Sequence, residues 1–119
     1  MTKTKWKNKI IEQCKSVGTY KESFLPVIET LAATLEQRDK THIEFIKSGG
    51  ESVVSYTNKG GSTNMTKNPL LVLWDELNKS ALSYWRDLGL TPSGLKKINE
   101  SALQKTKKSP LAEVLKEFD

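Results

Sequence analysis

Apolar residues recur every three or four positions along most of this chain, which is the spacing of one face of an α-helix. The pattern is broadest between Asn68 and Pro92, where Asn68 is a suitable N-cap and Pro69 suits the first helical position. The apolar face of the helix predicted here consists of Leu70, Trp74, Leu77, Ala81, Tyr84 and Leu88, flanked by Leu71, Leu73, Leu82 and Trp85. This sector is wider than the roughly 100° stripe that a surface helix needs, so we expect the helix to have more than one partner.

Two helices are predicted before this one. The first covers about residues 5 to 17, follows a mobile arm of residues 1 to 5, and ends at Gly18. The second covers about residues 23 to 47. Its start is either a capping box of Thr19 with Glu22 or Ser23 followed by Pro26.

Two more helices are predicted after it. Gly89 suits a left-handed residue at the end of the central helix, and Thr91-Pro92 repeats the combination of a cap and a proline, so a fourth helix is expected over about residues 92 to 104. A basic linker follows at residues 105 to 108. A fifth, amphipathic helix then begins at Ser109-Pro110, and its apolar stripe consists of Leu111, Val114, Leu115 and Phe118.

Residues 48 to 65 have a different pattern. Ser48-Gly49-Gly50 ends the second helix, and residues 53 to 57 are β-prone and lead into the turn residues Asn58-Lys59-Gly60-Gly61, so a small β-hairpin is expected over about residues 53 to 65. A lone two-stranded hairpin is marginal in water, so it should pack on the helices or pair with strands of neighbouring subunits. The predicted fold is mainly α, with four to five helices and this hairpin between the second and third, in a chain that forms a homo-oligomer. Residues 1 to 104 would be one helical domain, and residues 105 to 119 a linker with a terminal helix.

Composition narrows the class of protein. The chain has 119 residues, of which 28% are charged and 36% hydrophobic, and no apolar run approaches the roughly 18 residues that a membrane span needs. No signal-peptide pattern follows Met1, and Cys14 is the single cysteine, placed on the apolar side of the first helix. We therefore expect a soluble protein of a reducing cytoplasm, without a membrane partner, in which Cys14 is a buried thiol.

Charge is unevenly distributed along the chain. The net charge is +5; residues 1 to 21 carry +5, residues 22 to 94 carry −2 and residues 95 to 119 carry +2. Basic ends on a mildly acidic body suit a polyanion such as nucleic acid, although solvated termini have the same composition. The second helix is excluded from reading a DNA groove, because Glu22, Glu29 and Glu36 form an acidic stripe along it.

Two basic surfaces are candidates for binding DNA. The first consists of Lys3, Lys5, Lys7 and Lys9, with Trp6 among them; the alternative is a solvated terminus with Trp6 in the core. The second consists of Ser93, Lys96 and Lys97, in the opening turns of a helix reached through a tight corner, as in helix-turn-helix proteins; the alternative is a plain helix corner.

No catalytic or metal-binding set is found. His42 is the only histidine and lies far along the chain from Cys14, so no zinc site is predicted. Residues 59 to 63 lack the residue order of a phosphate-binding loop, and no serine or cysteine has a base beside it. Ordinary solvation accounts for the remaining acids considered, which are Asp39, Glu44, Asp75, Glu76 and Asp87. We therefore predict a non-enzyme without cofactors.

Three signatures resemble one protein family. They are the loop Tyr56-Thr57-Asn58-Lys59-Gly60-Gly61, the helix start Lys67-Asn68-Pro69-Leu70-Leu71, and the corner Tyr84-Trp85-Arg86-Asp87-Leu88-Gly89-Leu90-Thr91-Pro92-Ser93. In this order and spacing, from about Phe24 to Ile98, the chain is similar to the small terminase subunits of tailed bacteriophages. The resemblance implies a non-catalytic oligomer, usually a ring, in the cytoplasm of an infected bacterium. Such a protein binds viral double-stranded DNA near the packaging start and brings it to the large subunit, which has the ATPase and nuclease activities.

The resemblance and the sequence pattern together suggest roles for particular surfaces. The ring would form through the helices at 68 to 88 and 23 to 47, with interface residues Leu70, Leu71, Trp74, Leu77, Leu82, Tyr84 and Trp85. The fifth helix, through Leu111, Val114, Leu115 and Phe118, would dock the large subunit or pack on its own ring. The rival interpretation is a helical interaction adaptor or assembly chaperone that does not bind DNA.

Overall fold

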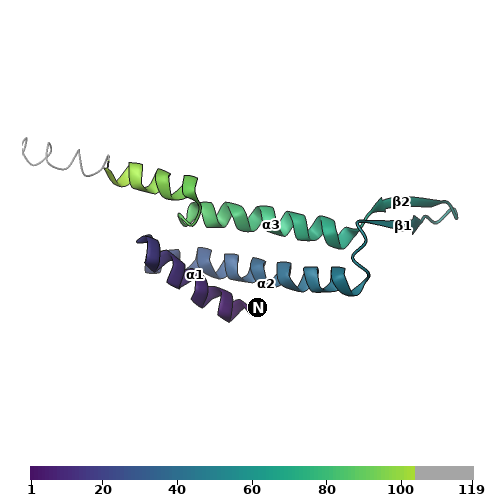
Figure 1. Cartoon of the computed structure of the whole chain (residues 1–119), viewed down its shortest axis with the longest axis horizontal. Helices are drawn as coiled ribbons and strands as arrows, with labels where there is room; N and C mark the ends of the chain where they lie inside the picture. The colour runs from purple at the N-terminus through teal and green to yellow at the C-terminus, as the bar shows by residue number, and fades with distance from the viewer. Residues whose placement is uncertain (104–119) are drawn as a thin grey trace, which may run out of the picture.

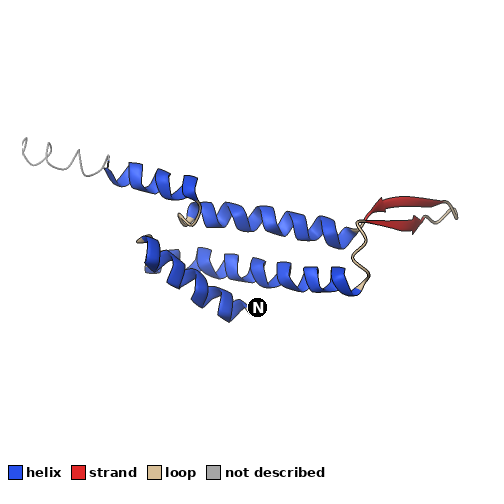
Figure 2. Cartoon of the chain, in the orientation of Figure 1, coloured by secondary structure: helices blue, strands red, loops and turns tan. Residues whose placement is uncertain are grey.

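The computed structural model describes residues 1 to 103 of the chain. In chain order the elements are helix α1 (Lys3–Val17), a 3₁₀ turn η1 (Glu22–Phe24), helix α2 (Leu25–Lys47), strands β1 (Val53–Thr57) and β2 (Thr63–Lys67), and helix α3 (Pro69–Asp87), as Figure 1 shows. Residues 92 to 103 are also helical. The mainly helical class, with a hairpin between the second and third helices, is confirmed (Figure 2).

The expected number of helices is corrected. Three α-helices have both ends among residues 1 to 103, rather than the four to five predicted, and the helical residues 92 to 103 run up to the last described position. The fifth helix predicted from Ser109-Pro110 lies outside the described residues. None of the helices in the described part of the chain is both long and apolar enough to cross a membrane.

Helices α2 and α3 lie side by side and antiparallel, and α1 packs on the first half of α2 (Figure 1). The core forms where the three helices meet, because each contributes one apolar face there. Its fully buried members are Ile10 and Cys14 of α1, Ile28, Leu31, Ala32 and Leu35 of α2, and Ala81 of α3, with Leu88 just after α3. The contacts of α1 along α2 reach Asp39, and the later turns of α2 lie beside α3.

The expectation of a mobile arm at residues 1 to 5 is wrong. Thr2 caps α1 by accepting a hydrogen bond from the backbone N–H of Lys5, so the helix begins at Lys3. The amino group of Met1 donates to Asp39 of α2 at 3.2 Å. The first residues are ordered because α2 supplies their partner, and a partner so distant in sequence gives no local signal.

The predicted capping box at Thr19 is also wrong. The hydroxyl of Thr19 donates instead to the carbonyl oxygen of Leu88 at 2.8 Å, which ties the loop after α1 to the end of α3. The chain enters α2 through the 3₁₀ turn η1, Phe24 makes no side-chain cap, and Pro26 lies in the first turn of the helix. The hydrogen bond from Thr19 to Leu88 thus takes the place of the predicted local bond within a capping box.

The hairpin extends beyond the end of the α2–α3 pair (Figure 2). Its strands are antiparallel, with Val53 opposite Lys67 and Thr57 opposite Thr63. At its base, the Asn68 side chain accepts from the Leu70 N–H, as the predicted cap requires, and donates to the carbonyl of Glu51. The strands therefore lead directly into the start of α3.

The corner after α3 is closely packed. Gly89 is left-handed with φ of 74°, and the N–H of Leu90 donates to the carbonyl of Trp85 at 2.8 Å. This is the expected geometry for a helix whose end is followed by a left-handed glycine. Thr91 caps the next helix by accepting from the Gly94 N–H at 3.1 Å. A Cβ on Gly94 would overlap the carbonyl oxygen of Arg86, so the two helices can approach this closely only with glycine there.

Candidate nucleic-acid interface

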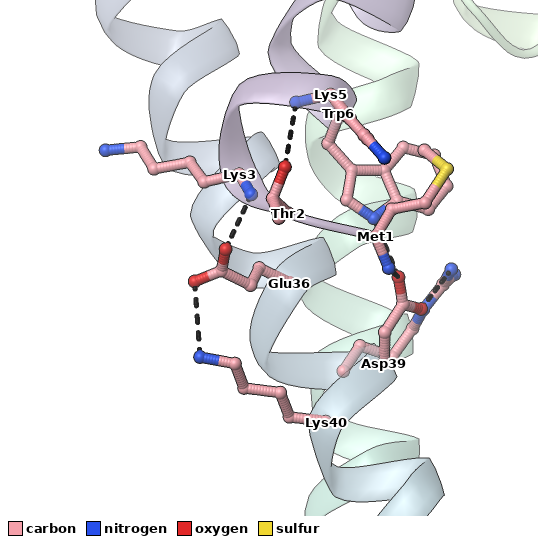
Figure 3. A network of polar contacts seen from close by, with 9 residues as sticks. Met1, Thr2, Lys3, Lys5, Trp6, Glu36, Asp39 and Lys40 are labelled. Atoms are coloured by element: carbon pink, nitrogen blue, oxygen red, sulfur yellow. Dashed lines mark hydrogen bonds and ion pairs between the residues drawn. The ribbon is translucent and has the colours of Figure 1, made fainter.

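The N-terminal lysines are only partly available to a ligand. The Nζ of Lys7 lies 3.0 Å from Glu29. The backbone N–H of Lys3 donates to Glu36 at 2.6 Å (Figure 3). The hydrogen bond from Lys7 lowers the pKa of Glu29, and the bond from the Lys3 backbone lowers the pKa of Glu36. The acidic stripe on α2 thus lies against the first half of α1 and neutralises part of the basic set that the sequence suggested for DNA.

Asp39 is the centre of this contact between α1 and α2. Its carboxylate accepts from the indole N–H of Trp6 at 2.8 Å and from the amino group of Met1 at 3.2 Å, and Arg38 Nη2 lies 3.2 Å from it (Figure 3). Burial raises the pKa of Asp39, but these three hydrogen bonds together outweigh burial and hold that pKa below its ordinary value. The expectation that Asp39 is an ordinary solvated acid is therefore wrong.

Trp6 has a structural place in this arrangement. Its half-buried ring packs against the core, and the Arg38 guanidinium lies 5.5 Å from the Trp6 ring centroid and 6.0 Å from that of Trp85. Of the lysines beside Trp6, Lys5 and Lys9 are exposed, and neither forms an ion pair within residues 1 to 103. Of the first set, Lys3, Lys5 and Lys9 thus have no side-chain ion pair among the described residues, and the Nζ of Lys9 lies 5.3 Å from the Trp6 ring centroid.

The second basic set lies on the helical residues 92 to 103. Ser93, Lys96 and Lys97 are all exposed there, and neither lysine forms an ion pair with another described residue. A groove of about 700 Å³ runs between α1 and this helix, with Lys9 and Gln13 on one side and Pro92 and Leu95 on the other. Of the two predicted basic sets, only Lys9 lines this groove.

A smaller groove includes a lysine that the sequence analysis did not single out. Lys21, in the loop between α1 and η1, lines a groove of about 370 Å³ together with Lys97 and Ser101 of the helical residues 92 to 103. The only signal for Lys21 in the sequence was the summed charge of residues 1 to 21, because nothing local shows that residue 21 approaches residue 97.

The residues predicted to form the oligomer interface are covered to different degrees by their own chain. Half-buried positions are Leu70, Leu71, Trp74, Leu77, Tyr84 and Trp85, whereas Leu82 is 47% exposed. Additional exposed apolar side chains are Leu73 at 41% on α3, and Ile43 at 50% and Ile46 at 59% on α2. Neither Ile43 nor Ile46 was among the predicted interface residues.

A model of the family described as phage terminase, small subunit, matches residues 2–105. The chain belongs to this family. The match confirms the resemblance seen in the Asn68-Pro69 helix start and the Leu88-to-Pro92 corner, and it includes α1 as well. Comparisons with curated proteins and with solved structures found no match.

Within residues 1 to 103, no group of three or more histidine, cysteine or acidic side chains is placed so that it could hold a metal ion. His42 is exposed, with its ring 5.3 Å from that of Trp74. Cys14 is buried, as expected, and burial raises the pKa of its thiol. The proposed docking residues Leu111, Val114, Leu115 and Phe118 lie outside the part of the chain that the structure describes.

Proposed function

We propose that this protein is a non-catalytic, DNA-binding subunit of a viral packaging motor, which acts as a homo-oligomer in the cytoplasm of the infected bacterium. It binds viral double-stranded DNA near the packaging start and recruits or regulates the large ATPase and nuclease subunit. The observation that carries the proposal is the family match over residues 2–105, which supports a role in packaging.

Unpaired basic side chains support the DNA-binding part of the proposal. Lys5, Lys9, Lys96 and Lys97 are exposed and project from α1 and the helical residues 92 to 103. Lys7 contributes less, because its Nζ is paired with Glu29, and the backbone N–H of Lys3 donates to Glu36, which places a carboxylate near that lysine as well. Phosphate contacts of this kind are tolerant of sequence and weaken steeply as salt rises.

The test is retention of labelled viral DNA in a gel at several salt concentrations. Reversal of charge in the double variant Lys5→Glu/Lys9→Glu should weaken retention at low salt. The matched control is Lys59→Glu/Lys67→Glu, which makes the same change in net charge at two exposed positions on or beside the hairpin strands. Wild-type protein that shows no salt-dependent retention would favour the rival function, an interaction adaptor without DNA binding.

Exposed apolar side chains on α2 and α3 support the homo-oligomer. Ile43 and Ile46 are exposed on the last turns of α2, and Leu73 and Leu82 are exposed on α3. A neighbouring copy, most simply in a ring, would cover these side chains together with the half-buried apolar residues of α3.

Light scattering tests this assembly. Wild-type protein should be oligomeric at micromolar concentration, and Ile46→Lys should shift the mass toward the monomer, whereas Gln37→Lys, an exposed position on the same helix, should not. A monomeric wild-type protein would contradict the ring. Weak DNA contacts on each subunit would sum in such an assembly, which is why the oligomer matters for affinity.

Recruitment of the large subunit is assigned to the amphipathic segment with Leu111, Val114, Leu115 and Phe118. Deletion of residues 109 to 119 should abolish binding of the large subunit in a pull-down assay. The number of subunits in the oligomer should stay the same, so that its mass falls only by the mass of the deleted residues. Loss of assembly in the deletion variant would instead mean that this segment packs on its own ring.

A further inference from the structure

The groove that Lys21 and Lys97 share is held in place by the corner after α3. On one side, Thr19 lies two residues before Lys21, is buried, and donates its hydroxyl hydrogen to the Leu88 carbonyl at 2.8 Å. The loop that presents Lys21 is therefore fixed to the last turn of α3.

The other side of the groove is fixed to the same corner. A Cβ on Gly89 would lie 2.8 Å from Cδ1 of Ile98 and 2.9 Å from Cγ2 of Thr19, so Ile98 and Thr19 both pack closely on this glycine. Ile98 directly follows Lys97 and lines the groove itself. Both lysines are thus attached to one rigid junction, and the spacing between them does not depend on a long flexible segment.

The electrostatic environment of this groove differs from that of the N-terminal lysines. The described residues that line it are Lys21, Lys97, Ile98, Ser101 and Ala102, and none of these has a carboxylate. Neither lysine forms an ion pair within the first 103 residues, whereas Lys7 is 3.0 Å from Glu29. Two lysines that line one groove favour an anion there, and Ser101 in the same lining has a hydroxyl that can donate a hydrogen bond. The Nζ of Lys21 lies 5.8 Å from the Phe24 ring centroid.

We propose that Lys21 and Lys97 form one shared phosphate-binding site, occupied by the backbone of double-stranded DNA. This site depends on the DNA-binding function proposed above. It would make one of the contacts between the protein and the DNA backbone. It joins the loop after α1 to the helical residues 92 to 103, so that a single phosphate contact involves both basic regions of the sequence. The acidic partners of α1 lie beside its first turns, at Lys3 and Lys7, whereas Lys21 follows the other end of that helix.

The test measures the affinity for labelled double-stranded DNA by fluorescence anisotropy at a series of salt concentrations. The variants are Lys21→Ala, Lys97→Ala and the double variant, with Lys59→Ala/Lys67→Ala as the charge-matched control. All four positions are exposed, so the variants should fold, which circular dichroism and light scattering verify. Each single variant should bind several-fold more weakly, with the salt slope reduced by up to about one per subunit, and the control should keep the wild-type slope.

The double variant tests whether the site is shared. Residues that act on one ligand group are coupled, so the loss in the double variant should differ from the product of the two single losses by more than about twofold. A loss equal to that product, an effect at only one of the two lysines, or an equal effect in the control would overturn the shared site.

The outcomes separate this site from the wider proposal. If wild-type protein binds DNA with a steep salt slope and both single variants keep that slope, the shared site is wrong and DNA binding stands. If wild-type protein shows no salt-dependent binding, both are wrong.

Discussion

Replacement of Gly94 by alanine tests the corner on which the candidate interface is built. Two opposite effects compete at this position. Alanine is the better helix former by about 1 kcal/mol, so in an open helix the change would stabilise the protein. Here the new Cβ would overlap the carbonyl oxygen of Arg86 and lie 2.9 Å from the carbonyl carbon.

The steric effect should be the larger one. The overlapping atoms belong to the backbone of α3, which cannot move aside by changing a rotamer, so the cost should lie near the upper end of the 1 to 3 kcal/mol typical of overpacking. After subtraction of the gain in helix propensity, Gly94→Ala should destabilise the protein by about 2 kcal/mol. For a chain of this length that corresponds to a fall in Tm of about 8 °C.

Thermal unfolding followed by circular dichroism measures this change, at one fixed protein concentration because oligomers have a concentration-dependent Tm. If the helical residues 92 to 103 detach instead, the helical signal should fall at low temperature, since a segment of this size is marginal as an isolated helix. Ser93→Ala, at an exposed position one residue earlier, is the control and should leave the Tm nearly unchanged. A Tm for Gly94→Ala at or above that of wild type, with an unchanged helical signal, would refute this description of the corner.

Three further predictions concern the contacts that join the helices. Asp39→Asn should lower the free energy of unfolding in urea by about 1 to 2 kcal/mol, because the bonds from Trp6 and Met1 lose their charged acceptor; Glu44→Gln, on the same helix, should not. The folded protein lowers the pKa of Glu29, Glu36 and Asp39, so the unfolded chain binds more protons in acid. The stability that these carboxylates contribute should be complete above their ordinary pKa values and should be lost as the pH falls through the lowered ones; an unfolding midpoint that does not change between neutral and acidic pH would contradict this. Thr19→Val should cost about 1 kcal/mol, because the buried carbonyl of Leu88 loses its donor, and Thr30→Val, at an exposed position, should cost less.

Several features of the fold could be predicted because their causes are local. Asn68 with Pro69, and Gly89 with Thr91, set the ends of helices through bonds to residues at most five positions away, and the structure has these bonds. The hairpin was predicted from β-prone residues on either side of a turn, and it is present with both strands ending about two residues from the expected limits or closer.

The candidate interface could be predicted only in part. Lys96 and Lys97 were selected because they follow a recognisable corner, and they are exposed as expected. Lys3 and Lys7 were selected on the same grounds of charge, yet Glu36 and Glu29 lie against them, because the acidic stripe on α2 faces the lysines of α1. Charge along a sequence does not show which charges face each other across two helices.

The amino-acid sequence by itself determined the helical class, the hairpin, the corner at Gly89 and the resemblance to small terminase subunits, since each depends on residues that are near one another in the chain. Only the tertiary structure decided that Asp39 holds the start of α1, that Thr19 bonds to Leu88, and that Lys21 and Lys97 line one groove. Each of these three relations involves residues separated by tens of positions, and the packing of the helices is what brings them together.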